Sequence, residues 1–569
     1  MRPVAALSTP SDGERRRSRP ARVLRAFTQP ARYSVLLAGA VPVLAFPSLD
    51  LEFLAWVGLV PGLLLLRAAP TAREAAVRGW WFGAGYLLMA LYWLTPNLGP
   101  GLLLVVVVLG VPWAAVGLAA WQLLRGPATP ASPATPATPA SPATPASSVL
   151  RTLLVGPTSP TGPAGPAGPT GPSLRRSLAA VAVLPSCWVV IDWIRSWQGI
   201  GGPWAVYGAS QWQHPVVLAL AAVGGIWLIS FVLVAANTAI VIMLTAASLA
   251  GRAVGAATAL LAVAAGPAAF ALTTAEYSAP ESGRVTLALV QPGLESAPQR
   301  TVAQEVRLTA REPRADLVVW AESSVGYDLR TSPRVLRTLT RLSAAIGSPL
   351  LVSQDALSPA GAKSKVAVLL GRGGIQESYT KSRLVPFGEY IPFRSALGWL
   401  TGISRAAPQN MVAGKGARVL HAVLPGGRRL SFGVLICFES AFPDMSRADA
   451  NHGAQVLIYQ TSDSTFQGSW APEQHASLAA VRAAETGRPA VQAALTGDSA
   501  AFDARGRQLA WAGTADRGVL RVTLTLPRAS ARTPFDRVGD FVAWIAIAIV
   551  ALAAAGAMYA RGRFRRAAP

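Results

Sequence analysis

The feature that most constrains this chain is a series of apolar stretches long enough to cross a lipid bilayer. A membrane-spanning helix needs roughly 20 consecutive apolar residues. Stretches of this kind lie at 33–49, 51–66, 79–95, 101–124, 177–194, 216–247, 251–272 and 541–560. Only 14% of the 569 residues are charged and 52% are hydrophobic, an apolar excess that a soluble fold does not need. We therefore expect an α-helical membrane bundle of about eight spans, although the prolines in the first two stretches are equally compatible with a hairpin of tilted helices.

The arginines predict how these helices are oriented. The formal net charge is +23, and eight Arg precede the first stretch while four follow the last one. In an eight-span arrangement, some short loops lie on the same side as the two termini, and these carry most of the remaining Arg near the spans. The short loops on the opposite side carry almost none apart from Arg195. Cytoplasmic loops are the ones enriched in Lys and Arg. We expect the basic N-terminal segment 1–32 and the tail 561–569 in the cytoplasm, residues 273–540 outside it, and no nucleic-acid partner.

A low-complexity segment at 126–176 separates membrane helices 1–4 (33–125) from helices 5–7 (177–272). Its Pro, Ala, Thr and Ser repeats, followed by a few Gly-Pro triplets, cannot bury a core. The triplets are too few for a collagen helix. We expect a cytoplasmic linker of disordered or polyproline-like character, with a cytoplasmic partner as an open possibility.

The sequence pattern changes after residue 283, where short β-like runs alternate with helical stretches up to about 530. The runs are 285–291, 316–323, 349–355, 366–371, 431–440 and 455–462, and a helical stretch covers 472–487. Such alternation predicts one sizeable α/β domain. A last membrane helix at 541–560 follows this domain.

Three residues at the ends of segments in this domain suggest chemistry. Glu322 follows one strand, Cys437 ends the most apolar strand, and Lys381 is one of only four lysines in an Arg-rich chain. Taken singly, each has an ordinary structural explanation. Together they supply a base, a nucleophile and a cation that can stabilise a thiolate and then an oxyanion. Active sites collect where strands end and loops begin.

Other site types are less well supported by the sequence. The four His have no Gly-x-Ser-x-Gly partner, and we expect His214 in an outer loop and His475 on a helical face to be solvated. The two cysteines, Cys187 and Cys437, provide neither a disulfide framework nor the spacing of a metal site. The Gly-rich segment 199–202 lacks a preceding strand and is expected to be a turn rather than a phosphate loop.

Three segments resemble the catalytic segments of the nitrilase superfamily in the form found in apolipoprotein N-acyltransferases. They are WAES at 320–323, KSRLVPFGEYIPF at 381–393 and ICFESAFPD at 436–444. The resemblance extends to GGPWAVYGASQ at 201–211 and to the order of the parts, with membrane helices before and after the α/β domain. It implies an α-β-β-α sandwich for residues 283–530, with Glu322 as general base, Lys381 as transition-state lysine, Cys437 as nucleophile, and Glu389 and Glu439 as supporting carboxylates.

The implied activity is transfer of an acyl chain from a membrane phospholipid to the α-amine of a diacylglyceryl-modified cysteine at the N terminus of an apolipoprotein. The transfer would pass through a Cys437 thioester in the bacterial plasma membrane, without metal or organic cofactor. Two departures from the family pattern concern the substrate entrance: Phe438 replaces the usual Tyr, and TSDSTFQG at 461–468 replaces a TNDTWFG-type segment. An aromatic residue usual after the first strand is also missing around Pro298.

Three alternatives remain at this stage. The first is a membrane-tethered nitrilase-type amidase, which has no use for eight spans. The second is a non-catalytic homologue that scaffolds lipoprotein or glycolipid enzymes, which the two departures would allow. The third is a transporter, but the spans carry few charges beyond Asp192.

Overall fold

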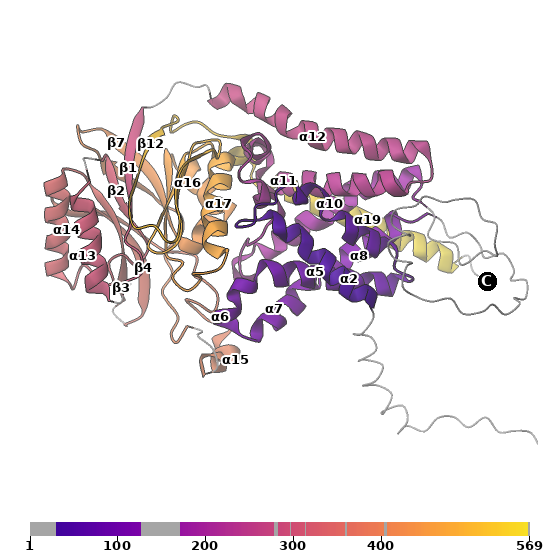
Figure 1. Cartoon of the computed structure of the whole chain (residues 1–569), viewed down its shortest axis with the longest axis horizontal. Coiled ribbons are helices and arrows are strands. Elements are labelled where there is room, and N and C mark those ends of the chain that lie inside the picture. The colour runs from indigo at the N-terminus through magenta and orange to yellow at the C-terminus, as the bar shows by residue number, and fades with distance from the viewer. Residues whose placement is uncertain are drawn as a thin grey trace, which may run out of the picture.

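A computed structural model describes residues 30–126, 171–277, 283–295, 297–312, 315–358, 361–402 and 407–566. A bundle of helices and an α/β domain lie end to end along the long axis of the molecule (Figure 1). Most of the basic N-terminal segment, residues 127–170 of the Pro-rich linker and the last three residues of the tail lie outside the described residues.

Five helices in the described part of the chain are long and apolar enough to cross a membrane. One of them is formed by two successive short helices, and another, α11 (Pro215–Thr245), is interrupted at Gly224 and Gly225. Their bounds are α7 (Gly101–Gly110) with α8 (Trp113–Leu123), α10 (Leu174–Arg195), α11 (Pro215–Thr245), α12 (Leu249–Tyr277) and α19 (Phe541–Arg566). Within the most apolar window of each helix, 72% of residues are buried in α11 but only 17% in α19. Helix α11 therefore forms the centre of the bundle, and the exposed apolar surface of α19 is suited to lipid.

The first three expected spans are shorter or more polar helices. They are α2 (Pro30–Ala40) with η1 (Val41–Ala45), α3 (Leu54–Val57) with α4 (Val60–Arg67), and α5 (Ala72–Ala90). Pro42 and Pro61 stand in the first turns of η1 and α4, where proline starts a new helix and cannot continue the preceding one. Glu74 in α5 forms ion pairs with Arg32 and Arg78. Each expected span thus contains helix, but the structure does not confirm a count of eight.

Several short helices connect these elements at the end of the bundle near the α/β domain. They are η2 (Tyr92–Leu94), α6 (Thr95–Leu98), η3 (Gln198–Ile200) and η4 (Tyr207–Gln211). The segment 199–202 belongs to such a turn, as expected, and Gly201 and Gly202 both have positive φ.

The α/β domain consists of two six-stranded sheets with the strand orders β12-β1-β2-β3-β4-β5 and β11-β10-β9-β8-β7-β6. The first sheet contains β1 (Arg284–Gln291), β2 (Leu317–Trp320), β3 (Leu350–Leu357), β4 (Lys363–Gly371), β5 (Gly374–Thr380) and β12 (Gly518–Thr525). The second contains β6 (Val419–Val423), β7 (Arg429–Ile436), β8 (Val456–Thr461), β9 (Ala490–Ala494), β10 (Ser499–Phe502) and β11 (Gln508–Ala512). The central pairs β1-β2, β2-β3, β7-β8 and β8-β9 are parallel.

Helices cover the outer face of each sheet. Helices α13 (Pro298–Ala310) and α14 (Pro333–Ile346) lie on the first sheet, away from the bundle, whereas α16 (Pro443–Asn451) and α17 (Ala471–Thr486) lie on the second sheet, towards it (Figure 1). Val319 belongs to the large core cluster, whereas its neighbours Val318 and Trp320 belong to the cluster that includes residues of α14. This alternation follows from the two-residue period of a strand. The α-β-β-α sandwich that the resemblance implies is therefore confirmed.

Among the described residues, four short helices remain, three within the α/β domain and one before the last membrane helix. Helix α15 (Arg394–Leu397) and η5 (Gly398–Gly402) follow the lysine segment, η6 (Cys437–Ala441) follows β7, and α18 (Pro534–Val538) precedes the last membrane helix. The expected strand 431–440 ends at Ile436, because Cys437 has a left-handed φ of 53° that a strand cannot contain.

Candidate active site

Cys437 lies at a sharp turn between β7 and η6. A positive φ of 53° is unusual for a residue other than glycine and strains the backbone. The carbonyl oxygen of Cys437 accepts hydrogen bonds from Ser440 Oγ at 2.9 Å and from His475 Nε2 at 3.1 Å. These two bonds hold the turn that presents the thiol.

Lys381 follows β5 and is fully buried, with 0% of its surface exposed. Its Nζ lies 2.8 Å from Glu389 Oε1 and 3.3 Å from Glu322 Oε1. Burial alone would lower the pKa of Lys381, but the two carboxylates raise it well above its ordinary value. The lysine is therefore a fixed buried cation rather than the ordinary surface residue that its sequence would also allow.

Glu322 and Glu389, the two carboxylates that contact this ammonium group, are both largely buried. Glu322 comes two residues after the end of β2 and is 5% exposed, while Glu389 is 8% exposed. The second carboxylate oxygen of Glu389 accepts a hydrogen bond from Val385 N at 2.9 Å. The loop after β5 thus folds back on itself and carries both Lys381 and the carboxylate that orients it.

The charges of Glu322 and Lys381 affect the pKa of the Cys437 thiol. Burial raises its pKa above the ordinary value, the negative charge of Glu322 raises it further, and the positive charge of Lys381 acts in the opposite direction. A cysteine in this setting is a neutral thiol at rest. It needs a nearby base to become a nucleophile.

Glu439 connects the cysteine turn to the lysine loop. One carboxylate oxygen accepts hydrogen bonds from the backbone N–H groups of Ser382 and Arg383 at 2.7 and 2.9 Å and from Tyr379 Oη at 2.8 Å. The other oxygen accepts a bond from Ile436 N at 2.9 Å. A single buried carboxylate thus fixes the residues on either side of both Lys381 and Cys437.

Lys365 also approaches the site. Its Nζ lies 2.7 Å from Asp355 Oδ1 and bonds to Ser323 Oγ, next to Glu322. Burial would lower the pKa of Lys365, but the charges of Glu322 and Asp355 raise it above its usual value.

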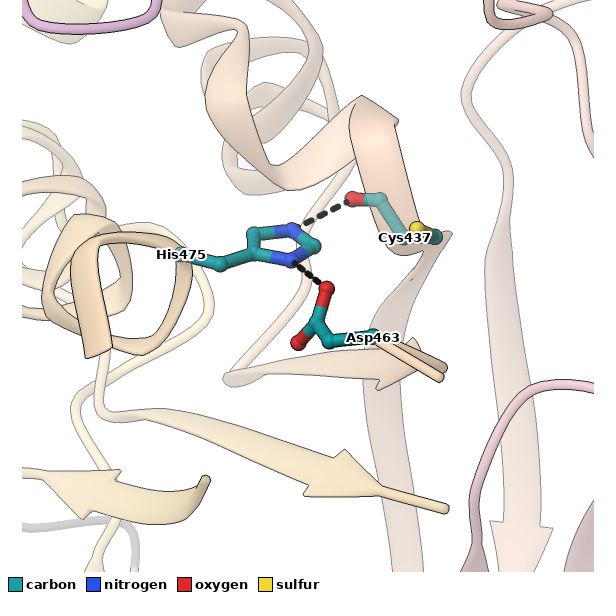
Figure 2. A group of neighbouring side chains, drawn as sticks. All are labelled: Cys437, Asp463 and His475. Carbon is teal, nitrogen blue, oxygen red and sulfur yellow. Dashed lines mark hydrogen bonds and ion pairs between the residues drawn. The ribbon is translucent and has the colours of Figure 1, made fainter. Parts of the chain in front are cut away.

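The expectation that His475 is solvated is wrong. His475 lies on α17, and every residue of this helix except Glu473 is buried, with contacts to the second sheet and to the bundle. Its Nδ1 lies 3.0 Å from Asp463 Oδ1 and its Nε2 contacts the Cys437 carbonyl oxygen (Figure 2). Helical periodicity gave no sign of this burial, because α17 is covered on all sides and has no solvated face. The sequence analysis assigned no site role to His475 or to Asp463.

Aromatic side chains join the helical bundle to the cysteine turn. Trp204, from the segment between α10 and α11, packs edge-on against His475 at 5.3 Å and lies over Phe438 at 6.5 Å. Trp93 of η2 packs against Trp204 at 5.2 Å. Gly202 leaves the space that the Phe438 ring needs, since a Cβ there would lie 2.7 Å from it. Segments that connect the helices of the bundle therefore form one wall of the site.

Comparisons with known proteins agree with this arrangement. Residues 284–532 match the carbon-nitrogen hydrolase family, and residues 38–154 and 165–239 match the apolipoprotein N-acyltransferase N-terminal domain. An apolipoprotein N-acyltransferase of Geobacter metallireducens is 27% identical over 91% of this chain and 94% of its own length. One of Sinorhizobium medicae is 32% identical over 66% of this chain and 72% of its own length.

Among solved structures, an amidase from Nesterenkonia sp. is 22% identical, with a TM-score of 0.33, over 46% of this chain and 95% of the amidase. The two domain matches occur together in one chain, and relatives of this name align with both parts of it. The chain belongs to the apolipoprotein N-acyltransferase family.

Proposed function

We propose that this protein transfers an acyl chain from a membrane phospholipid to the free α-amine of a diacylglyceryl-modified cysteine at the N terminus of apolipoproteins. The observation that carries the proposal is the buried Lys381 ammonium group, held between Glu322 and Glu389 beside the Cys437 thiol. This set provides what acyl transfer through a thioester needs: a nucleophile, a base and a fixed positive charge.

In the first step, Glu322 removes the proton from Cys437 Sγ, and the sulfur attacks the carbonyl carbon of the sn-1 ester. Negative charge develops on the carbonyl oxygen, where the Lys381 ammonium group stabilises it. When the ester C–O bond breaks, the leaving oxygen takes the proton from Glu322. The products are a lysophospholipid and an acyl thioester on Cys437.

In the second step, the lipoprotein amine attacks the thioester carbonyl carbon. Glu322 takes a proton from the nitrogen and returns it to the sulfur as the C–S bond breaks. The product is an amide, and the enzyme returns to its starting state. Glu389 keeps Lys381 in position through both steps, and Glu439 holds the two catalytic loops together.

The position of the site supports lipid substrates. Trp204 lies in the segment between α10 and α11 and packs against His475, and Trp93 of η2 packs against Trp204. A site at the end of a membrane bundle can receive an acyl chain and a lipid-anchored amine without removing either from the bilayer. Lipid-anchored substrates also give the helical bundle a purpose that a small soluble amide would not.

We also propose that the α/β domain lies outside the cytoplasm of a bacterial plasma membrane, with domain limits as expected from the sequence. In Figure 1, helix α19 runs from the α/β domain to the opposite end of the bundle, where its Arg-rich terminus lies. The Arg asymmetry of the loops supports a cytoplasmic location for that opposite end.

The alternatives have less support. A membrane-tethered amidase would not account for the match to the N-terminal membrane domain of the acyltransferases. A non-catalytic scaffold would have no need to bury an ammonium group between two carboxylates beside a thiol. The Phe438 ring packs edge-on against Phe442 at 4.8 Å. The residue at this position therefore packs in the structure although it lacks the hydroxyl group of a tyrosine.

Intact mass spectrometry of the full-length protein incubated with phospholipid tests the proposal. We expect one acyl adduct on Cys437, which disappears when a peptide with an N-terminal diacylglyceryl-cysteine is added, as the peptide becomes acylated. Folded protein without an adduct would favour the scaffold. An adduct that water removes but the peptide does not would favour a hydrolase. Complementation of a strain that lacks N-acyltransferase tests the same activity in cells.

A further inference from the structure

A second group of side chains meets at Cys437. Two of its members, Asp463 and His475, take no part in the chemical steps of the proposed reaction. Cys437, Asp463 and His475 each offer one potential ligand atom, and these atoms all lie within 4.8 Å of one another (Figure 2). Thiolate, carboxylate and imidazole are the side-chain groups that bind zinc. We propose that these three residues form an inhibitory site for a divalent transition-metal ion of the zinc class, which blocks the nucleophile before it is acylated.

The histidine is already oriented as a metal ligand. Its Nε2 lies 3.1 Å from the Cys437 carbonyl oxygen, which can only accept a hydrogen bond, so Nε2 carries the hydrogen. Its Nδ1 faces Asp463 Oδ1 at 3.0 Å. Metal-bound histidines usually donate their other ring N–H to a carbonyl or carboxylate, which fixes the ring. The bond to Cys437 therefore leaves Nδ1 for the metal ion, which would replace the hydrogen that Nδ1 donates to Asp463 Oδ1.

The surroundings carry an excess of negative charge. Asp463 is 3% exposed, and its Oδ2 has no hydrogen-bond partner among the described residues. Across the thiol, two cations, Lys381 and Lys365, face three carboxylates, those of Glu322, Glu389 and Asp355. Buried acceptors normally have partners. A divalent cation would give Asp463 a partner and balance the charge at this end of the site.

The geometry requires a small closure. Metal-ligand bonds of about 2.0–2.3 Å in a tetrahedron place the ligand atoms roughly 3.3–3.8 Å apart. The most distant pair in the group must therefore approach by about 1 Å, which rotation of the cysteine side chain can supply. Three protein ligands would leave a fourth position for water, so the ion can exchange.

The inference rests on the proposed function in one respect, the role of Cys437 as nucleophile. Metal binding would take the sulfur lone pair and stop attack on the ester. A thioester sulfur carries no negative charge and is a poor ligand. The resting enzyme is therefore sensitive to the metal, and the acyl-enzyme is resistant.

Cobalt titration of the full-length protein tests the site directly. The protein is purified with a tag that contains no histidine and treated with a chelator, which is then removed. We expect one Co²⁺ per chain with a sulfur-to-cobalt charge-transfer band, which Zn²⁺ displaces. Cys437→Ala should abolish the band although Cys187 remains. His475→Gln and Asp463→Asn should weaken cobalt binding by about tenfold or more.

His452→Gln is the matched control, because His452 is exposed at the end of α16 and lies outside the group. It should bind cobalt as the parent does. A missing band, a band that survives Cys437→Ala, or affinity unchanged in both His475→Gln and Asp463→Asn would overturn the inference.

A further experiment distinguishes failure of this inference from failure of the proposed function. Preincubation with phospholipid should remove the band in proportion to the acyl adduct seen by mass spectrometry. Cobalt binding that depends on the three residues in a protein that never forms an adduct would uphold the metal site and refute the proposed nucleophile. An adduct that forms normally in saturating Zn²⁺ would refute the inhibition.

Discussion

The carboxylate of Glu485 in the α/β domain accepts a hydrogen bond from the backbone N–H of Ile226 in the central membrane helix, at 2.8 Å. Helix α11 is interrupted at Gly224 and Gly225, and Gly225 has a φ of 69°. The interruption frees the Ile226 N–H from its helical partner, and Glu485 provides the missing acceptor. One buried side chain thereby ties the catalytic domain to the centre of the bundle.

Glu485→Ala should destabilise the protein by about 1–3 kcal/mol, because it leaves a buried N–H without an acceptor. Thermal unfolding in detergent provides the measurement. Glu485→Gln keeps an acceptor oxygen and is the matched control, with a smaller loss expected. Equal losses in both variants would mean that the hydrogen bond contributes little.

The same residue predicts a pH dependence of stability. Burial raises the pKa of Glu485 from 4.5 to about 7, although Arg482 acts against this shift. The folded state then holds a proton that the unfolded chain has lost between about pH 4.5 and 7, so the contribution to stability is present at low pH and lost as pH rises through this window. The slope of the unfolding temperature over this range should be shallower in Glu485→Gln. Asp536 has a similar raised pKa of about 7 and should maintain part of the slope.

Cys437→Ser should form almost no acyl adduct. The serine hydroxyl is a poorer nucleophile near neutral pH, and a base placed to accept a thiol proton does not compensate. Cys437→Ala should form none. Cys187→Ser serves as the control and should retain the parent rate of adduct formation, measured by intact mass. An acylated Cys437→Ser variant at the parent rate would contradict the assigned role.

Lys381→Arg should lower the rate of acylation by about 10²-fold or more, the scale found when one oxyanion-stabilising donor is removed. Arginine keeps the charge but cannot place a single compact donor between Glu322 and Glu389. Lys415→Arg makes the same change at an exposed position and should have no effect. Full activity of Lys381→Arg would show that the charge alone suffices.

His475→Ala removes one of the two hydrogen bonds that hold the turn at Cys437. The backbone strain of this turn costs about 1–3 kcal/mol, so its loss of support should slow thioester formation by about tenfold or more. His475→Gln retains a side-chain N–H that can reach the carbonyl oxygen and should restore part of the rate. The unfolding temperature is measured beside the rate of adduct formation. Rates that fall only as the unfolding temperature falls would mean that His475 acts through stability alone.

A reporter placed after residue 150 should be active only in the cytoplasm, and one placed within 330–345 only outside it. The Arg asymmetry of the loops gives this expectation. Both reporters on the same side of the membrane would refute the proposed orientation.

The sequence by itself predicted the membrane-spanning character and the α/β domain, and it pointed to Glu322, Lys381 and Cys437 as candidate site residues. Apolar length and strand periodicity are local properties, and the catalytic segments are contiguous strings. Only the tertiary structure showed that Lys381 lies between two carboxylates, that Glu439 bonds to both catalytic loops, and that His475 is buried against the cysteine turn. These relationships join residues far apart in the chain through side-chain contacts. A helix such as α17, covered by a sheet on one side and membrane helices on the other, has no polar face by which periodicity could locate its buried histidine.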